Sequence, residues 1–411
     1  MKQISEHDNE GRAAIPLLYT FAFMAIGSFM PYIAPYLKTL GFTGTQIGTI
    51  TATGTTVAIF AVAFWGSIYN TIDHPKDAGS RRNVRQREAF LLACLCVSAG
   101  IFAVCLKSVA GFVLVLLFYG LIYFVQPPTF SLIDAFAVYN QGTGSDKGFG
   151  GKRAWGSVGF ALGVLIGGRA AGFTSEVVIF YLYIACFAIT AAVLVYIAAK
   201  SSGSVRSGAP ISDKAPEKKG SYRMLLHEKR VCQLLICMFF MGGTNGANNT
   251  YFSFLYIEGG GTLAGVGIVM LLMVGSEVPF MAWCDKLAQR FTLQKTILYA
   301  MIISSARFVL YGFGLPWWML VVLSFTQGAV NGIILVEFIR FISRIAPAGC
   351  KSLAVSAYYV IGSNISTIVC QFFGGMILDS FGAAGVYMFF GLFNLAGTIL
   401  YVLFGLHKVK I

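Results

Sequence analysis

The sequence is poor in charged residues. Only 11% of its 411 residues are Asp, Glu, Lys or Arg, while 57% are hydrophobic and 36 are Phe. An average soluble domain carries about 25% charged residues. This chain therefore has too few charges to solvate an exterior in water, and more apolar surface than one soluble core could bury. The composition excludes a soluble globular domain and indicates that lipid surrounds most of the chain.

Histidine is also scarce, and the cysteines form no recognisable motif. No histidine falls inside a long apolar run, so the side chain that most often titrates near neutral pH is missing from the predicted spans. The nine cysteines show no metal-ligand spacing, and we expect free thiols that pack between helices. No Walker run, nucleophile elbow or metal-ligand array occurs, so we expect no metal, no cofactor and no enzymatic activity. The histidines are His7, His74, His227 and His407.

Apolar runs long enough to cross about 30 Å of hydrocarbon recur along the whole chain. We count twelve, and they predict an all-α membrane protein with twelve transmembrane helices. The predicted spans are 14–36, 45–71, 89–106, 109–139, 153–172, 175–199, 231–256, 262–284, 294–313, 315–339, 352–375 and 383–406.

The longest polar interruption is Ser201–Glu228, which is rich in Ser, Gly, Pro and Lys and has no periodicity. Such a composition is typical of a linker. It divides the chain into an N-terminal six-helix bundle (1–200), a cytoplasmic linker (201–228) and a C-terminal six-helix bundle (229–411). Two halves of six spans are typical of secondary carriers, whose substrate binds between pseudo-symmetric halves.

Lys and Arg are concentrated in alternate gaps between the spans. By the positive-inside rule the gaps that hold them face the cytoplasm, which places both termini there and the protein in a plasma (inner) membrane. The net charge of +13 is then a signal of topology, and we expect no nucleic-acid partner. The opposite side holds Lys38, Lys107 and Arg169; the clusters lie at Lys2, Arg12, 76–87, 147–153, 200–230, 286–295, 340–351 and 408–410.

A few ionisable residues nevertheless stand inside apolar runs. Such groups cost roughly 2.5–3.5 kcal/mol each on insertion scales, so they indicate a path for a polar solute. Arg153 lies near the start of its run, and the four that lie well inside are Asp134, Glu277, Arg307 and Glu337.

Several segments resemble the major facilitator superfamily. They are Gly27-Ser-Phe-Met-Pro31, the Asp134-Ala-Phe segment, Arg153-Ala-Trp-Gly-Ser-Val-Gly-Phe160 and Ser276-Glu277. Within the superfamily the chain resembles the lactose permease-like branch, which also holds nucleoside and phenylpropionate carriers. The resemblance covers nearly the whole chain and implies two pseudo-symmetric six-helix bundles, secondary transport and alternating access.

The resemblance implies roles for individual residues. Asp134 and Arg153 match an acid and an arginine that contact sugar hydroxyls in the sugar permeases. Phe160 matches an aromatic that stacks on the sugar ring, and it lies two helical turns after Arg153 on the same face. Glu277 and Arg307 match the acid of the eighth helix and the arginine of the ninth.

The chain also departs from the sugar permeases. A histidine and a carboxylate of the tenth helix are replaced by Gln327 and Val330, and acids of the seventh helix by Gly246 and Asn249. The proton site of that branch therefore does not transfer. Glu277, Arg307 and Glu337 are left as candidates for proton coupling.

Further candidates for solute contact come from polar and aromatic residues near these groups. The segment 245–251 is more polar than a lipid-facing helix permits, so we expect it to line a cavity. Glycines at 156, 159, 163 and 167 have the spacing that lets two helices approach closely. The candidate substrate contacts besides Asp134, Arg153 and Phe160 are Trp155, Asn245, Asn248, Asn249 and Tyr251.

Structural interpretations remain open for the charged residues. Asp134 and Arg153 can simply lock two helices together, because a buried pair resists the loss of either partner. Glu337 is three residues from Arg340, a spacing typical of an intrahelical pair.

The sequence predicts a monomeric secondary active transporter that moves a small polar solute, a sugar or nucleoside, by alternating access, with protons as the expected coupling ion. The alternatives are an aromatic-acid permease, an exporter or flippase of amphiphilic molecules, and a receptor that binds without transporting.

Overall fold

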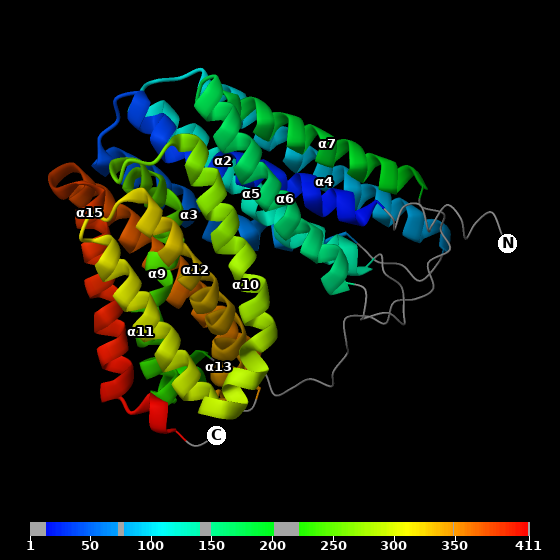
Figure 1. The fold of residues 1–411 in the computed structure, drawn as a ribbon. Coiled ribbons are helices and arrows are strands. Elements are labelled where there is room, and N and C mark those ends of the chain that lie inside the picture. Colours follow the sequence, from blue (N-terminus) through cyan, green and yellow to red (C-terminus); the bar gives the residue numbers. More distant parts are fainter. Residues whose placement is uncertain (1–13, 73–77, 140–148, 201–221, 348, 410–411) are drawn as a thin grey trace. The chain divides into compact units, whose positions relative to one another are not determined.

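The chain is almost entirely helical. A computed structural model describes residues 14–72, 78–139, 149–200, 222–347 and 349–409, and these contain no strand (Figure 1). The helices of the first half are α2 (Ile15–Thr39), α3 (Gly44–Asn70), α4 (Ala78–Lys107), α5 (Phe112–Tyr139), α6 (Phe149–Phe173) and α7 (Val178–Lys200). Those of the second half are α8 (Tyr222–His227), α9 (Lys229–Glu258), α10 (Leu263–Phe291), α11 (Leu293–Tyr311), α12 (Trp317–Ile333), η1 (Ile334–Phe338), α13 (Ile339–Ile345), α14 (Lys351–Ala357), η2 (Tyr358–Ile365), α15 (Ser366–Leu403) and η3 (Leu406–Lys408).

The prediction of twelve spans is confirmed. Nine segments within the described residues are long and apolar enough to cross a membrane. The helix α9, whose segment 244–250 is polar, is not among them, and the part Leu263–Glu277 of the 29-residue helix α10 is apolar. One of the nine, Lys351–Leu403, contains Gly382 with φ 67°, a conformation that suits glycine and divides α15 into two spans.

The chain forms two compact units, which are described separately. Unit 1 comprises Met1–Tyr32 and Thr53–Asp213, and unit 2 comprises Ile33–Ala52 and Lys214–Ile411. The end of α2 and the start of α3 therefore belong to unit 2, while the rest of both helices belongs to unit 1. The turn that joins these two helices includes Gly41, whose φ of 85° favours glycine.

In unit 1, α4 packs against α5 and α7, and α6 crosses α2 at very short range. A Cβ atom at Gly159 or Gly163 would collide with a backbone carbonyl of α2, that of Thr20 or that of Met24. Only glycine leaves room for backbone contact of this kind. The prediction that these α6 glycines permit a close helix approach is confirmed.

In unit 2, α9 and α11 both pack along α15, and α10 packs against α12 (Figure 1). Buried polar bonds tie three of these helices together. Asn394 of α15 accepts a hydrogen bond from Ser304 of α11 at 3.0 Å and donates one to Thr244 of α9 at 2.5 Å. Polar side chains buried in this way are satisfied within the bundle, as lipid requires.

Two segments of unit 2, η1 and η2, are π-helical, and they face each other. The rings of Phe338 in η1 and Tyr358 in η2 lie 4.3 Å apart between centroids. Widened turns of this kind occur frequently at functional sites.

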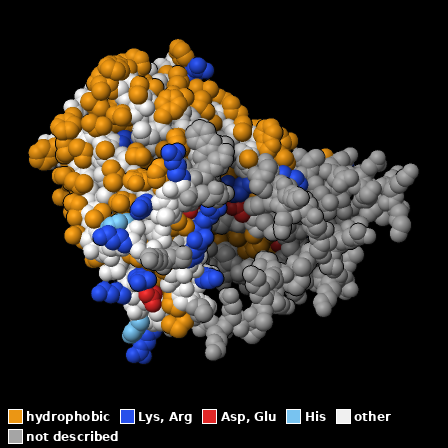
Figure 2. Space-filling view, turned by 60° about the horizontal axis from the view of Figure 1, so that its bottom comes forward, with side chains coloured by type: hydrophobic (Ala, Val, Ile, Leu, Met, Phe, Trp, Pro, Cys, Tyr) orange, Lys and Arg blue, Asp and Glu red, His pale blue; other side chains and the backbone are white. Residues whose placement is uncertain are grey.

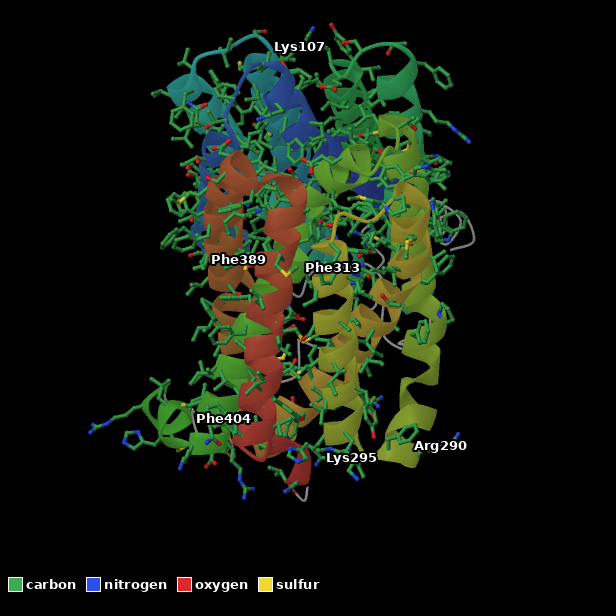
Figure 3. The ribbon with its side chains drawn as sticks, turned by 60° about the vertical axis from the view of Figure 1, so that its left-hand side comes forward. Lys107, Arg290, Lys295, Phe313, Phe389 and Phe404 are labelled. Carbon is green, nitrogen blue, oxygen red and sulfur yellow. The ribbon has the colours of Figure 1, made fainter. Side chains whose placement is uncertain are left out.

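Basic side chains gather at the end of unit 2 that comes forward in Figure 2. Arg290 closes α10 and Lys295 lies near the start of α11, and Figure 3 shows both at the end of unit 2 opposite Phe313. We call this the basic end of unit 2. Lys408 lies there as well, because the carbonyl of its neighbour Val409 accepts a hydrogen bond from Gln294, the residue before Lys295.

Gly159→Ala is expected to lower the midpoint of thermal unfolding in detergent. The added methyl group has no space against the α2 backbone, and overpacking of this kind costs about 1–3 kcal/mol. Gly100→Ala in α4 is the matched control, since a Cβ there meets only Ile184 at 3.9 Å. Equal losses in the two variants would contradict a backbone contact that depends on glycine.

Candidate functional site

Unit 1 contains a cluster around Asp134. The Nε atom of Arg153, from α6, lies 3.2 Å and 3.3 Å from the two carboxylate oxygens of Asp134 on α5. The hydroxyl of Tyr19, from α2, donates a hydrogen bond to the same carboxylate at 2.7 Å. The structure therefore brings the predicted pair together and adds a tyrosine to it.

Aromatic rings form one wall of this cluster. The guanidinium of Arg153 lies 5.3 Å from the ring centroid of Phe23, within the range of a cation–π contact. Phe23 in turn meets Phe130 edge to face, with centroids 4.9 Å apart. Gly156 packs directly on the Phe23 ring, so a side chain there would displace it. We call Tyr19, Phe23, Asp134 and Arg153 the unit 1 cluster.

The unit 1 cluster keeps hydrogen-bonding capacity to spare. Arg153 contacts Asp134 through Nε alone, and its two terminal nitrogens have no partner among the residues that the structure describes. Its side chain is 42% exposed and that of Asp134 is 34% exposed, although Tyr19 is fully buried. A guanidinium presents its remaining donors in a planar fork that suits oxygen acceptors. The cluster can therefore receive a polar solute without first breaking its own ion pair.

The other predicted contacts of α6 differ in their surroundings. Phe160 is half-buried, and its backbone carbonyl lies against Gly27 of α2. Trp155 is 48% exposed, whereas the next residue, Gly156, is buried. Neither side chain touches the unit 1 cluster through a hydrogen bond or ring contact within the described part of the chain.

Unit 2 contains a buried arginine whose positive charge has few polar partners. Arg307 of α11 is 1% exposed, and its best polar contact is a long hydrogen bond of 3.5 Å from Nη2 to Oδ1 of Asn245. Its Nε and Nη1 atoms are buried without a hydrogen-bond partner in the described residues. The guanidinium lies 4.4 Å from the ring centroid of Phe308 and 6.0 Å from that of Tyr311. Most of its favourable contact is therefore with aromatic faces.

Glu277 does not pair with this arginine in the structure. Its Oε1 accepts a hydrogen bond from Nδ2 of Asn331 on α12 at 2.8 Å, and no ion pair involves Glu277 or Arg307 among the described residues. The nearby Gln327 is buried with its Oε1 atom unpartnered, while Val330 is fully buried. Each of the two groups matched to the eighth and ninth helices is therefore hydrogen-bonded to a neutral amide.

The polar segment of α9 contains side chains with different surroundings. Oδ1 of the buried Asn248 accepts a hydrogen bond from the Tyr387 hydroxyl at 2.7 Å, whereas Asn249 is exposed. Tyr251 is fully buried and donates its hydroxyl to the backbone carbonyl of Gln371. Only Asn245 of the four predicted contacts also touches Arg307.

Glu337 forms the intrahelical pair that its spacing indicates. Its Oε1 lies 3.0 Å from Nη1 of Arg340, and its side chain is fully buried while that of Arg340 is 42% exposed. Glu337 stands in the π-helical η1, where the backbone is widened. The pair is therefore compatible with a structural role.

Sequence reasoning missed three side chains that complete these groups: Tyr19, Phe23 and Asn331. A tyrosine or phenylalanine in an apolar span is ordinary, so their types carried no signal. Asn331 is an amide inside an apolar run, four residues after Gln327, and this could have identified it. No group of three or more potential metal ligands occurs in the described residues.

Comparisons with known proteins agree with this architecture. Residues 13–389 match the MFS_1 like family. A maltose permease of Geobacillus stearothermophilus is 30% identical over 396 residues, which cover 95% of this chain and 94% of the permease. The uncharacterized transporter YwbF of Bacillus subtilis (strain 168) is 28% identical over 387 residues, covering 94% of this chain and 91% of that protein.

Solved structures show the same fold at lower identity. The nucleoside transporter NupG has a TM-score of 0.80 at 16% identity, covering 97% of this chain and 100% of its own. A bacterial homolog of the human lysosomal transporter Spinster, inward-facing and unoccupied, has a TM-score of 0.68 at 13% identity, covering 98% and 97%. The family model covers most of the chain, and the maltose permease is matched almost from end to end. The protein is therefore a multi-pass membrane transporter and not an enzyme, and it belongs to the MFS_1 like family of the major facilitator superfamily.

Proposed function

We propose that the protein moves a small polar solute, a sugar or nucleoside, by alternating access and in company with protons. The observation that carries this proposal is the unit 1 cluster, where Arg153 keeps two terminal nitrogens free of partners among the described residues while Asp134 holds its Nε. Hydroxyl groups are good acceptors for these nitrogens and good donors to the carboxylate.

The aromatic wall supports the same class of solute. Phe23 lies beside Arg153, and Phe160 lies two turns further along the same helix. Aromatic faces pack well on the apolar C–H face of a sugar ring or on a nucleobase, while charged groups bind the polar edge. The names of two relatives, a maltose permease and the nucleoside transporter NupG, point in the same direction.

Proton coupling is proposed for unit 2. Glu277 and Arg307 are bonded to neutral amides, Asn331 and Asn245, rather than to each other. A carboxylate that loses its proton inside the bundle needs a compensating charge, and the uncompensated guanidinium of Arg307 is a suitable partner. Glu277 would then contact Asn331 when it is protonated and Arg307 when it is ionised.

The buried Arg307 also favours a second candidate, an aromatic-acid permease. The Nε and Nη1 atoms of this guanidinium, which lack partners among the described residues, would donate hydrogen bonds to a carboxylate of the solute. A flippase of amphiphiles has less support, because the polar groups Asp134, Arg153 and Asn245 would have no role in it. Thermal-shift screening against sugars, nucleosides and aromatic acids separates these classes, because a bound ligand raises stability by RT ln(1 + [L]/Kd).

The membrane and the orientation of the protein follow from the distribution of its basic residues. It would act as a monomer in the plasma (inner) membrane, with both termini and the 201–228 linker in the cytoplasm, and with functional halves at 1–200 and 229–411. The concentration of Lys and Arg at the basic end of unit 2 supports this orientation.

Arg153→Lys is expected to weaken solute binding roughly 10- to 100-fold, nearly as much as Arg153→Ala, because a point charge does not replace a planar fork. Asp134→Asn should have a comparable effect, and Tyr19→Phe a smaller one through the position of Asp134. The measurement is the ligand-induced thermal shift of purified, monodisperse protein. Arg169→Lys, in the same helix but exposed, is the control and should bind as the wild type does. Wild-type affinity in both Arg153→Lys and Asp134→Asn would show that the pair only locks helices.

Glu277→Gln is expected to retain solute exchange but to lose uphill accumulation and its dependence on pH, because a permanently neutral side chain completes the cycle without releasing a proton. Counterflow in proteoliposomes measures exchange, and uptake driven by a pH gradient measures accumulation. Should the variant still concentrate solute with only a proton gradient, Glu277 is not the coupling residue. Should the wild type ignore the gradient, the protein is a facilitator or uses another ion.

Labelling of single cysteines with a membrane-impermeant maleimide tests the orientation. In a cysteine-free background, Ser207→Cys in the linker should stay unlabelled in intact cells and react after the cells are opened. Ser108→Cys, between α4 and α5, is predicted to face outward and should react in intact cells. The reverse pattern would overturn the proposed topology.

A further inference from the structure

The short helix α8 does not continue into the span that follows it. The helix ends at His227 and α9 begins at Lys229, and between them Glu228 has φ −78° and ψ 98°, which is extended backbone. Figure 3 shows α8 running sideways from the base of α9, at the end of unit 2 that carries Lys295. A short helix that leaves a span at its end in this way lies along the membrane surface.

Contacts with the rest of unit 2 hold α8 in this position. Leu225 is 1% exposed and belongs to the buried core of unit 2, together with residues of α9, α13 and α14. The thiol of Cys232 in α9 donates a hydrogen bond to the backbone carbonyl of Leu226 at 3.2 Å, which ties the end of α8 to α9. The helix is therefore a fixed part of unit 2, although it lies inside the segment 201–228 that the sequence predicts to be a linker.

The outward side of α8 combines apolar and cationic side chains. Met224 is 44% exposed and Leu226 is 61% exposed. Arg223 precedes them along the chain, Lys229 and Arg230 follow them, and all three cations are exposed. Exposed apolar and basic residues that alternate in this way are typical of a segment that rests on a membrane surface. We call Arg223, Met224, Leu226, Lys229 and Arg230 the α8 surface.

The charge and the apolar character of the α8 surface together suit one kind of partner. The stretch 222–230 contains three cations and one acid, the half-buried Glu228, so its charge is positive. Basic clusters beside a span attract anionic headgroups, and the planar guanidinium groups of the two arginines suit phosphate oxygens. A dissolved anion would leave the exposed apolar side chains without a contact, whereas a lipid also packs its acyl chains on them. We propose that the α8 surface binds an anionic phospholipid, with its three cations at the headgroup and with Met224 and Leu226 among the upper acyl segments.

Two other basic residues at the same end of unit 2 provide a matched control. Arg290 lies in the last turn of α10 and Lys295 in the first turn of α11, and both side chains are exposed. They belong to the long helices themselves and not to a helix that leaves its span. Replacing them removes charge from the same end of the protein and leaves the α8 surface intact.

The test places a fluorophore on the α8 surface. Met224→Cys is labelled with bimane in a background in which the other cysteines are replaced, with Cys232→Ser to retain a donor for the Leu226 carbonyl. The protein is reconstituted into phosphatidylcholine nanodiscs that contain an equal, minor fraction of either brominated phosphatidylglycerol or brominated phosphatidylcholine, because bromine quenches only fluorophores in contact with it. We expect brominated phosphatidylglycerol to quench roughly five- to tenfold more strongly, since Lys and Arg near the surface attract anionic lipids and salt screens part of this attraction.

Arg223→Gln, Lys229→Gln and Arg230→Gln combined in one monodisperse variant should bring the two lipids to equal quenching, whereas Arg290→Gln combined with Lys295→Gln should keep the preference. Equal quenching by the two lipids without these substitutions, or an equal loss of preference in the two variants, would overturn the proposal. Inorganic phosphate that abolishes the preference at an ionic strength at which sodium chloride does not would assign the cations to a dissolved anion and overturn it as well. The measurement needs no solute, so its outcome is independent of the proposed function.

Discussion

The structure depends on one constraint, which is that lipid offers no hydrogen bonds. Every polar group at membrane depth must find its partner inside the bundle, and an isolated charge there is costly. Several buried side chains of the described spans obey this rule: Asn394 is bonded to two other helices, and Asn248 to Tyr387. Other groups depart from it: Gln327 is buried with its Oε1 atom unpartnered among the described residues, and the two arginines Arg153 and Arg307 keep donors without partners there. Their unused donors mark where the protein keeps polar capacity that the fold itself does not need.

The two units keep this capacity in different forms. In unit 1, Arg153 is already paired with Asp134 and is 42% exposed, so its charge is balanced and accessible. In unit 2, Arg307 is 1% exposed and has only a long contact with Asn245. A balanced and accessible site suits a neutral solute. An unbalanced and buried charge suits a group whose own charge changes during the cycle, which is the physical basis for assigning binding and coupling to different halves.

Sequence patterns predicted the helices well because lipid imposes length and apolarity on every span. The pairing of Asp134 with Arg153 was also predictable, since two opposite charges in neighbouring spans have few other partners. The contributions of Tyr19 and Asn331 were not, because whether an uncharged polar side chain faces a charge depends on helix rotation. The same limit applies to residues 33–52, whose packing in unit 2 depends on glycines that lie far apart in the chain, such as Gly44 and Gly375.

The glycine contact between α2 and α6 has a consequence for selectivity. Because the α6 backbone at Gly159 and Gly163 rests on the α2 carbonyls of Thr20 and Met24, the two helices cannot slide past each other without steric collision. Tyr19 and Phe23 lie on α2, and Arg153 lies on α6. Their spacing is consequently set by main-chain atoms and not by adaptable side chains. The solute-binding surface proposed for unit 1 would therefore be rigid, and we expect it to select solutes by their size and by the placement of their hydroxyl groups.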